Sequence, residues 1–137
     1  MTEERFVARQ IGVVGAVVIR NGLVLCAKRG KHGSLPGLWE FPGGKIERGE
    51  LPSGALIREI KEELAVSIAV GDEIVTTTHE YEFGVVSLTT FYCTLLAGAP
   101  VPLEHAEIAW LGPADLMTVQ WAPADIPAVQ RVQADIG

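Results

Sequence analysis

Residues 52–64 form an amphipathic segment between two pairs of β-rich runs, and this order limits the folds open to the chain. The segment starts with Pro, which suits the first turn of a helix, and its apolar residues Ile57, Ile60 and Leu64 recur at helical spacing. Turn residues join the runs of each pair, at Asn21-Gly22 and at Gly84. The runs are Ile11–Ile19 and Leu23–Ala27 before the helix, and Ile74–Phe83 and Val85–Leu95 after it. Two hairpins around one helix predict an α/β fold with a mixed sheet packed against helices.

Shorter elements complete the predicted fold. The Gly- and Pro-rich stretch 30–44 indicates loops with one short strand at 38–41. Another short strand is expected near 108–111. Two further helices are expected at 113–117 and 125–134, each with a Pro near its start.

Length and composition favour one globular domain over residues 1–137, since 48% of the side chains are apolar and 20% are charged. The longest uncharged apolar stretch, 11–19, is far shorter than the roughly 20 residues that cross a bilayer. The start, Met1–Arg5, lacks the basic and apolar blocks of a secretory signal, so a cytoplasmic protein is expected. Cys26 and Cys93 lie in apolar runs and are expected to be buried thiols.

The net charge of −6 is unevenly distributed along the chain. Residues 1–61 hold ten basic and six acidic side chains, a balance of +4, and residues 62–137 hold one basic and eleven acidic, a balance of −10. An anionic ligand should therefore favour the first half or arrive with a cation. The acidic balance and the absence of a long basic stripe argue against nucleic-acid binding.

Three carboxylates, Glu59, Glu62 and Glu63, share one face of the predicted helix 52–64. Like charges three and four residues apart destabilise an isolated helix by a few tenths of a kcal/mol per pair. One interpretation is a solvated face on which Arg58 and Lys61 compensate the acids. The other is a site for a hard divalent cation, which takes oxygen ligands.

The surrounding stretch resembles the signature of the Nudix hydrolase family, which favours the cation site. The signature runs Gly, five residues, Glu, seven residues, then Arg-Glu-apolar-any-Glu-Glu-any-Gly-apolar. It is matched at Gly44, Glu50, Arg58, Glu59, Ile60, Glu62, Glu63 and Val66. Ala65 departs from it, because the family has Gly there. Ala65 either keeps the left-handed geometry of that Gly, at a cost of about 1 kcal/mol, or the helix ends differently.

The resemblance extends over about residues 10–132. Residues 38–45 look like the strand and loop of MutT-type members, and 104–110 and 121–127 are similar to the CTP pyrophosphohydrolase and dCTP-preferring subgroup. It implies a Nudix fold, an α/β/α sandwich around a mixed β-sheet. It also implies a hydrolase that needs Mg²⁺, with Mn²⁺ as a substitute, and splits a nucleoside triphosphate into a monophosphate and pyrophosphate. Cytosine nucleotides (CTP, dCTP, modified dCTP) are the expected substrates, with 8-oxo-dGTP next.

Two other functions use the same signature. Hydrolysis of a nucleoside diphosphate derivative, such as a sugar nucleotide, would need different outer loops. A non-catalytic nucleotide-binding module would be expected to have lost the acids that this chain keeps. The task in the cell is either cleansing or balancing of the nucleotide pool, and the chain is expected to be a monomer or a homodimer.

Carried over by position, the resemblance gives a metal-binding set and a structural pair. The metal-binding set is Glu59, Glu62 and Glu63, with the carbonyl of Gly43 or Gly44, and Glu104 from outside the signature. Glu107 is the nearest competitor of Glu104, and either Glu59 or Glu62 is the general base. Glu50 and Arg58 are expected to stabilise the loop and helix by an ion pair.

The resemblance to MutT-type members also implies substrate-binding roles for Arg29, Phe41 and Asp125, with Lys45 as a further candidate. Arg29 is expected to bind phosphate, although with Lys28 and Lys31 it could be an exposed basic cluster; Lys45 is a weaker candidate. Phe41 lies either near the base or in the core. Asp125 has two expected roles, which are compatible with each other. It can be the N-cap of the last helix, and, since an ionised Asp only accepts hydrogen bonds, it can read an exocyclic amine such as cytosine N4.

Overall fold

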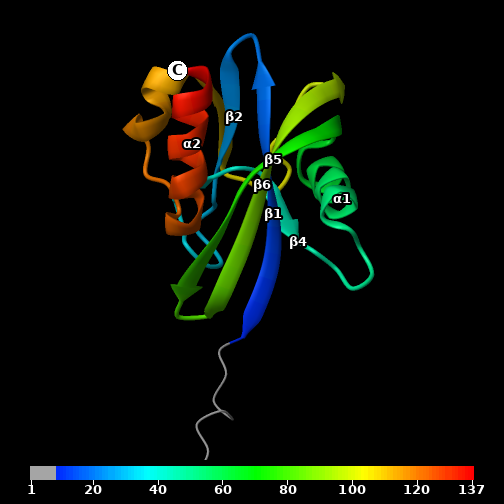
Figure 1. The fold of residues 1–137 in the computed structure, drawn as a ribbon, viewed down its shortest axis with the longest axis vertical. Coiled ribbons are helices and arrows are strands. Elements are labelled where there is room, and N and C mark those ends of the chain that lie inside the picture. Colours follow the sequence, from blue (N-terminus) through cyan, green and yellow to red (C-terminus); the bar gives the residue numbers. More distant parts are fainter. Residues whose placement is uncertain (1–8) are drawn as a thin grey trace, which may run out of the picture.

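The computed structural model describes residues 9–137 and contains the predicted hairpins and central helix (Figure 1). The interpretation of Met1–Arg5 lies outside these residues. The strands are β1 (Gln10–Arg20), β2 (Leu23–Lys28), β3 (Trp39–Glu40), β4 (Gly43–Lys45), β5 (Ser67–Tyr81), β6 (Gly84–Ala97) and β7 (Glu107–Leu111). The helices are α1 (Pro52–Leu64) and α2 (Ile126–Ile136), with 3-10 turns η2 (Pro113–Thr118) and η3 (Pro123–Asp125).

Strand β1 is the centre of a mixed sheet. In residues 9–137 the seven strands follow the order β3-β2-β1-β6-β5, with β4 paired to β1 and β7 paired to β2. On one edge β1 runs parallel to β6, and on the other it pairs antiparallel with β4 at 13–15 and with β2 at 19–20. The chain between β3 and β4 is held against β1 because Ala16 N–H donates to the Pro42 carbonyl (2.8 Å). The sheet edge therefore divides at Phe41 and Pro42.

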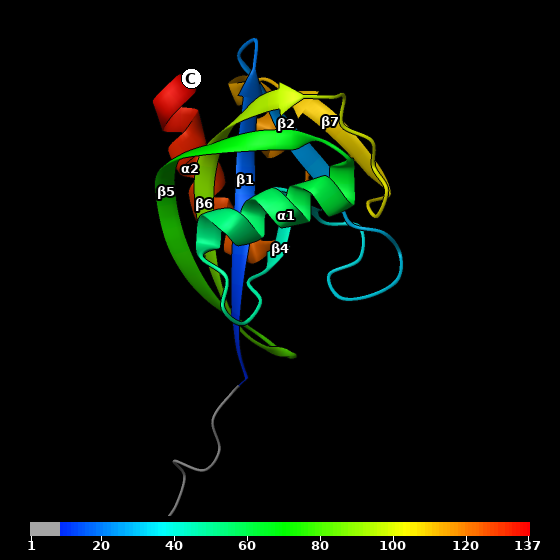
Figure 2. The same cartoon turned by 90° about the vertical axis from the view of Figure 1, so that its right-hand side faces the viewer.

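The two helices cover opposite faces of the sheet, as Figures 1 and 2 show. Helix α1 buries Leu56, Ile60 and Leu64 against Val14 and Leu25 of the sheet. Helix α2 buries Val129 and Val132 in a second cluster. The second cluster also holds Val17, Val24, Trp39, Phe41 and Trp121. Alternation of side chains along β1 supplies both clusters, which confirms the α/β/α sandwich.

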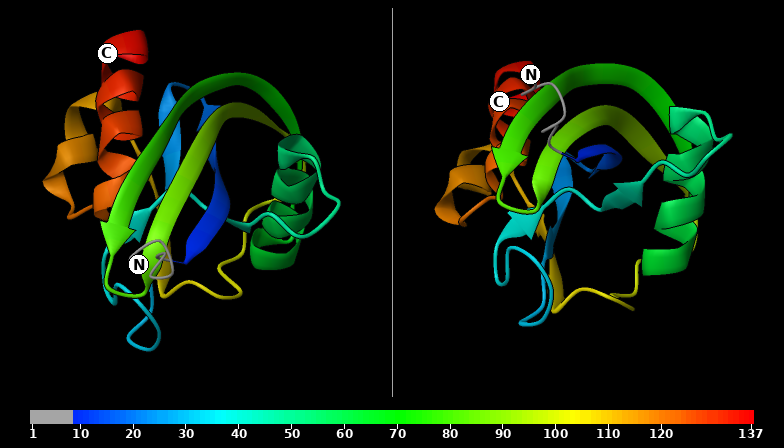
Figure 3. Two further views of the ribbon diagram at one scale, coloured as in Figure 1. Left: turned by 60° about the horizontal axis from the view of Figure 1, so that its bottom comes forward. Right: turned by 90° about the horizontal axis from the view of Figure 1, so that it is seen from below.

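Several boundaries differ from the sequence prediction. Strand β5 starts at Ser67 rather than at Ile74, and register irregularities near Gly71 break the alternation that would have shown this. Residues 43–45 form a strand where loop was expected, because β1 pairs with them. Residues 113–118 form a 3-10 turn instead of an α-helix. The curved β5–β6 pair arches over the rest of the sheet (Figure 3).

Two details of α1 also needed the structure. Ile57, which the helical spacing placed on the buried face, is 43% exposed, and Ala55 and Leu56 are buried instead. Ala65 keeps the left-handed conformation (φ 59°, ψ 34°), and its N–H donates to the Lys61 carbonyl. The helix thus ends with the geometry that favours Gly, although Ala occupies the position.

None of the helices in residues 9–137 has the length and apolarity that a membrane crossing requires. Cys26 and Cys93 are free, buried thiols, as predicted, and burial raises the pKa of each to about 12.

Candidate active site

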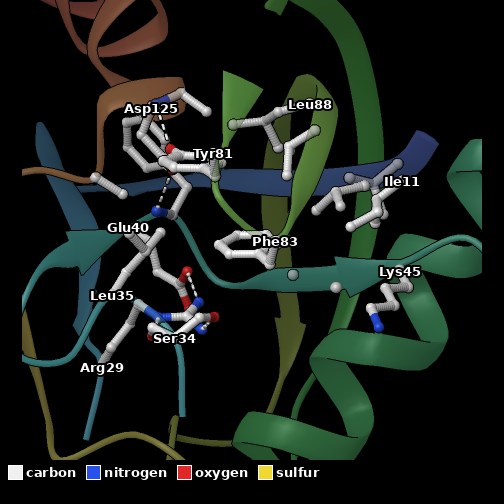
Figure 4. A pocket seen from close by; sticks show the side chains of 18 of the residues that line it. Ile11, Arg29, Ser34, Leu35, Glu40, Lys45, Tyr81, Phe83, Leu88 and Asp125 are labelled. Atoms are coloured by element: carbon white, nitrogen blue, oxygen red, sulfur yellow. Dashed lines mark hydrogen bonds and ion pairs between the residues drawn. The ribbon is translucent and has the colours of Figure 1, made fainter. Parts of the chain in front are cut away.

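A cavity of about 300 Å³ opens where the sheet edge divides between β3 and β4 (Figure 4). Its walls come from the 29–35 loop, the chain from β3 to β4, the tip of the β5–β6 hairpin and residues 122–125. The predicted residues that line it are Arg29, Phe41, Gly43, Gly44, Lys45, Glu63 and Asp125. The structure therefore brings together residues that are almost one hundred positions apart.

The acidic end of the cavity is formed by α1 and the chain at β4. Burial, together with the charges of Glu40, Glu59 and Glu104, raises the pKa of Glu63 to about 8. One oxygen of Glu63, Oε1, is buried and has no hydrogen-bond partner among the described residues. An uncompensated buried carboxylate is costly, and a cation at this place would relieve that cost.

Gly44 lets the Glu59 carboxylate lie directly against the backbone. A Cβ built on Gly44 would overlap that carboxylate, and one on Gly43 would overlap the Val14 carbonyl of β1. Both positions therefore require Gly for close approach rather than for an unusual φ angle. Burial raises the pKa of Glu59, and the neighbouring Arg58 opposes this change.

Arg58 connects the helix with the loop before it. Its Nε and Nη2 donate to the two oxygens of Glu50 (2.6 and 2.9 Å), and Nη2 also donates to the Lys45 carbonyl (3.1 Å). The predicted ion pair is therefore present. Arg58 holds the pKa of Glu50 down to about 2, and Glu50 also accepts the Glu47 N–H. This bidentate contact fixes the loop against α1.

The same guanidinium holds two of the predicted metal-binding acids. Arg58 Nη1 donates to Glu59 Oε2 (3.1 Å) and to Glu62 Oε2 (3.3 Å), and the Glu62 side chain is 53% exposed. In the part of the chain that the structure describes, no three His, Cys, Asp or Glu side chains stand close enough together to hold a metal ion. A cation would therefore have to compete with Arg58 for these two carboxylates.

Glu104, rather than Glu107, lies beside these acids. Its negative charge raises the pKa of both Glu59 and Glu63, whereas Glu107 lies at the start of β7, opposite Lys28 in the register of β7 with β2. The segment that carries Glu104 is bonded to the end of α1, since Leu103 N–H donates to the Glu63 carbonyl (3.1 Å).

Arg29 lines the cavity, whereas Lys28 and Lys31 lie outside its lining. Its Nη1 donates to Glu40 Oε1 (2.7 Å), and Nε and Nη2 donate to the carbonyl and hydroxyl oxygens of Ser34 (2.8 and 3.0 Å). The second Glu40 oxygen bonds to His105 Nε2 (2.9 Å). Sequence reasoning missed Glu40, Ser34 and His105, because no spacing in the sequence relates them.

The apolar end of the cavity contains aromatic rings. Phe41 is buried and packs on Trp121 at 4.8 Å, so it belongs to the core on the α2 side as well as to the cavity lining. Tyr81 and Phe83 from the hairpin tip also line the cavity, and their rings stack at 5.1 Å. Sequence reasoning missed these two rings, although a Tyr-Glu-Phe run beside a hairpin turn places two aromatic side chains together at the hairpin tip.

Asp125 is not the side-chain cap of the last helix, so that expectation is wrong. The residue precedes α2, but its carboxylate makes no capping hydrogen bond, and the residue is only 6% exposed. Its Oδ2 instead accepts the Phe41 N–H (3.0 Å). Burial raises the pKa of Asp125 well above its usual value, so the assumption of a simple ionised Asp also needs correction.

Comparison with known proteins identifies the family. The family model described as "NUDIX domain" matches residues 13–131. The chain belongs to the Nudix hydrolase family. It is 33% identical to the CTP pyrophosphohydrolase of Escherichia coli K12, over 92% of this chain and 93% of that protein. It is 39% identical to putative 8-oxo-dGTP diphosphatase 2 of Mycobacterium tuberculosis, over 85% and 82%.

Solved Nudix structures share the fold. A solution structure of the MutT protein of the Nudix hydrolase family from methicillin-resistant Staphylococcus aureus 252 matches with a TM-score of 0.78 and 48% identity. The match covers 93% of this chain and 98% of that one. The chain is thus a MutT-type Nudix pyrophosphohydrolase, with Glu59, Glu62 and Glu63 in its Nudix signature.

Proposed function

We propose that the chain hydrolyses nucleoside triphosphates to a monophosphate and pyrophosphate with Mg²⁺, and that cytosine nucleotides are its preferred substrates. One observation carries the proposal: a single cavity extends from Glu63 of α1 to a buried hydrogen-bonding carboxyl, Asp125, beside aromatic rings. A nucleoside triphosphate has the same two ends, a charged chain that needs cations and a flat base that needs apolar walls.

The cation site is assigned to Glu59, Glu62, Glu63 and Glu104, with a carbonyl oxygen of Gly43 or Gly44. These carboxylates would have to move closer together around the ion, because Arg58 holds Glu59 and Glu62 in its absence. These are hard oxygen donors of the kind that Mg²⁺ and Mn²⁺ prefer, and the unpartnered Oε1 of Glu63 fits such a role. When bound, the cation supplies neutralisation of phosphate charge and acidification of a nearby water. The carboxylates orient that water and the phosphates.

The general base is assigned to Glu59 or Glu62. Replacing the general base with Gln should lower kcat by about 10²- to 10⁴-fold. Replacing a Glu that only binds the cation with Gln should mainly raise the Mg²⁺ concentration that gives half of the maximal rate. Steady-state rates of E59Q and E62Q across a Mg²⁺ titration distinguish the two roles.

Arg29 is assigned to the phosphates, with Lys45 as a weaker contributor at the cavity edge. A guanidinium has five N–H donors, and Glu40 and Ser34 use three of those on Arg29. Two donors remain, one on Nη1 and one on Nη2, and the side chain is 30% exposed. This is sufficient for a bidentate contact with a phosphate.

Base selection is assigned to Asp125. Since Oδ2 accepts the Phe41 N–H, contact with the base is assigned to Oδ1. When the carboxyl is ionised, Oδ1 accepts a hydrogen bond from the cytosine N4 amine, and the raised pKa of Asp125 means that this state is reached at a higher pH than for an ordinary Asp. Phe41, Tyr81 and Phe83 would flank the base. The name of the mycobacterial relative makes 8-oxo-dGTP the second substrate to test.

The experiment is release of pyrophosphate and of phosphate from a panel of triphosphates, with Mg²⁺ and with EDTA. The panel contains CTP, dCTP, 5-methyl-dCTP, 8-oxo-dGTP, the other nucleoside triphosphates and sugar nucleotides. Pyrophosphate release that is fastest for the cytosine nucleotides and is abolished by EDTA is expected. No turnover of any triphosphate with Mg²⁺ would refute the proposal.

D125N tests the assignment of Asp125. The Phe41 N–H needs an acceptor, so the amide carbonyl would face Phe41 and the amide NH₂ would face the cavity. An NH₂ group donates but does not accept, so preference should move from cytosine toward a base with a carbonyl, such as 8-oxoguanine. An unchanged ranking of substrates would show that Asp125 does not read the base.

A further inference from the structure

His105 lies in the connection from β6 to β7, and nothing in the proposed chemistry uses it. Its side chain is 5% exposed, and its Nε2 bonds to Glu40 Oε2 at 2.9 Å. Because a carboxylate only accepts, the Nε2–H donates in this bond. The other ring nitrogen, Nδ1, is buried and has no partner among the described residues. A native protein retains such an incomplete polar contact at a cost, so the contact calls for an explanation.

Glu40 connects His105 to the cavity. Its Oε1 accepts Arg29 Nη1 at 2.7 Å, so one carboxylate holds a histidine on one side and the guanidinium on the other. Glu40 lies on β3, Arg29 directly follows β2, and His105 lies in the connection from β6 to β7. Three separate segments are thus joined at one side chain.

The backbone on either side of Glu104 is also anchored. Leu103 N–H donates to the Glu63 carbonyl of α1, and Ala106 N–H donates to the Lys28 carbonyl of β2 (2.9 Å). Among the described residues between these two anchors, only His105 makes a side-chain hydrogen bond to another part of the protein. It is adjacent in sequence to Glu104, so its contact with Glu40 limits the movement of the backbone that presents Glu104.

We propose that His105 is a positioning residue that, through Glu40, fixes both the Arg29 guanidinium and the backbone that carries Glu104. This inference rests on the proposed function, which places Arg29 at the phosphates and Glu104 at the cation. Without the imidazole, the connection from β6 to β7 keeps its two backbone anchors but not the contact between them. Glu40 also loses one of its two partners, so Arg29 is held less firmly.

The test compares H105A with H105Q, which keeps a terminal N–H donor of similar reach. L103A is the matched control, because it removes an exposed side chain from the same connection and keeps the backbone anchor. Mn²⁺ affinity is measured by electron paramagnetic resonance on each full chain without nucleotide. KM and kcat are measured separately, and melting temperatures report folding.

H105A should lower Mn²⁺ affinity or kcat/KM by about 10- to 100-fold, in the range found when partners of metal ligands are removed. H105Q should restore most of this loss, and L103A should behave like the wild type. If H105A lowers the melting temperature but leaves Mn²⁺ affinity, KM and kcat unchanged, His105 acts only in packing and the inference is wrong. Failure of H105Q to restore the loss also overturns it.

Two further outcomes separate this inference from the proposed function. If the wild type hydrolyses no triphosphate but H105A still weakens Mn²⁺ binding and H105Q restores it, the proposed reaction fails and the positioning role stands. If E104Q binds Mn²⁺ as the wild type does, Glu104 is not in the cation site, and the part of the inference that concerns Glu104 is overturned. A wild-type chain that binds no Mn²⁺ overturns both.

Discussion

Replacing Ala65 with Gly should stabilise the protein without changing its activity. Ala65 ends α1 with φ 59° and ψ 34°, a left-handed conformation that costs a residue with a Cβ roughly 1–2 kcal/mol. Gly removes this cost but gains about 0.4–1 kcal/mol of conformational entropy in the unfolded chain. The net gain in the free energy of unfolding is about 0.5–1 kcal/mol. For a chain of this size, that corresponds to a rise in melting temperature of roughly 2–4 °C.

Urea denaturation and calorimetry on A65G measure these quantities. N21G is a matched comparison, because Asn21 is also left-handed (φ 54°) in an exposed turn. Asn tolerates this conformation better than Ala, so N21G should gain less. Ala65 is exposed and does not line the cavity, so kcat/KM should stay within about twofold of the wild type. An unchanged or lower melting temperature, or a large increase in rate, would refute this reasoning.

Three further substitutions test other parts of the structure. G44A should lower kcat/KM strongly in steady-state kinetics, because the new Cβ would overlap the Glu59 carboxylate. G54A is the control: its Cβ would lie in open space, so it should keep full activity. The stability of D125N relative to the wild type should be higher at pH 8 than at pH 4. Burial raises the folded pKa of Asp125, so the stability that the wild-type carboxyl contributes is present below the unfolded pKa of 3.8 and is lost as the pH rises through the folded pKa. Melting temperatures that differ equally at both pH values would contradict this. E50Q should show the opposite pH dependence, because the folded pKa of Glu50 is about 2. The decrease in melting temperature that E50Q causes should be larger at pH 7 than at pH 3. An equal decrease at both pH values would contradict the role of the ion pair with Arg58.

Local sequence determined the parts of the fold in which neighbours in sequence are neighbours in space. Pro52 and the apolar spacing after it predicted α1 with its observed bounds, and Asn21-Gly22 predicted the first hairpin. The ion pair of Glu50 and Arg58 was also expected, since both belong to one signature. Ile57 was misplaced, because the direction from which the sheet covers α1 is not a property of the helix alone.

Tertiary structure alone decided how the site is assembled. The sequence could place Asp125 beside the last helix, but only the fold brings its carboxylate to the Phe41 N–H and buries it, which changes its pKa. It likewise joins Arg29, Glu40 and His105 from three separate segments. The sequence by itself determined the family, the helix and the residue types of its chemistry. Burial and hydrogen-bond partners depend on which distant segments pack together, so the charge states, the cavity and the positioning contacts came only from the folded chain.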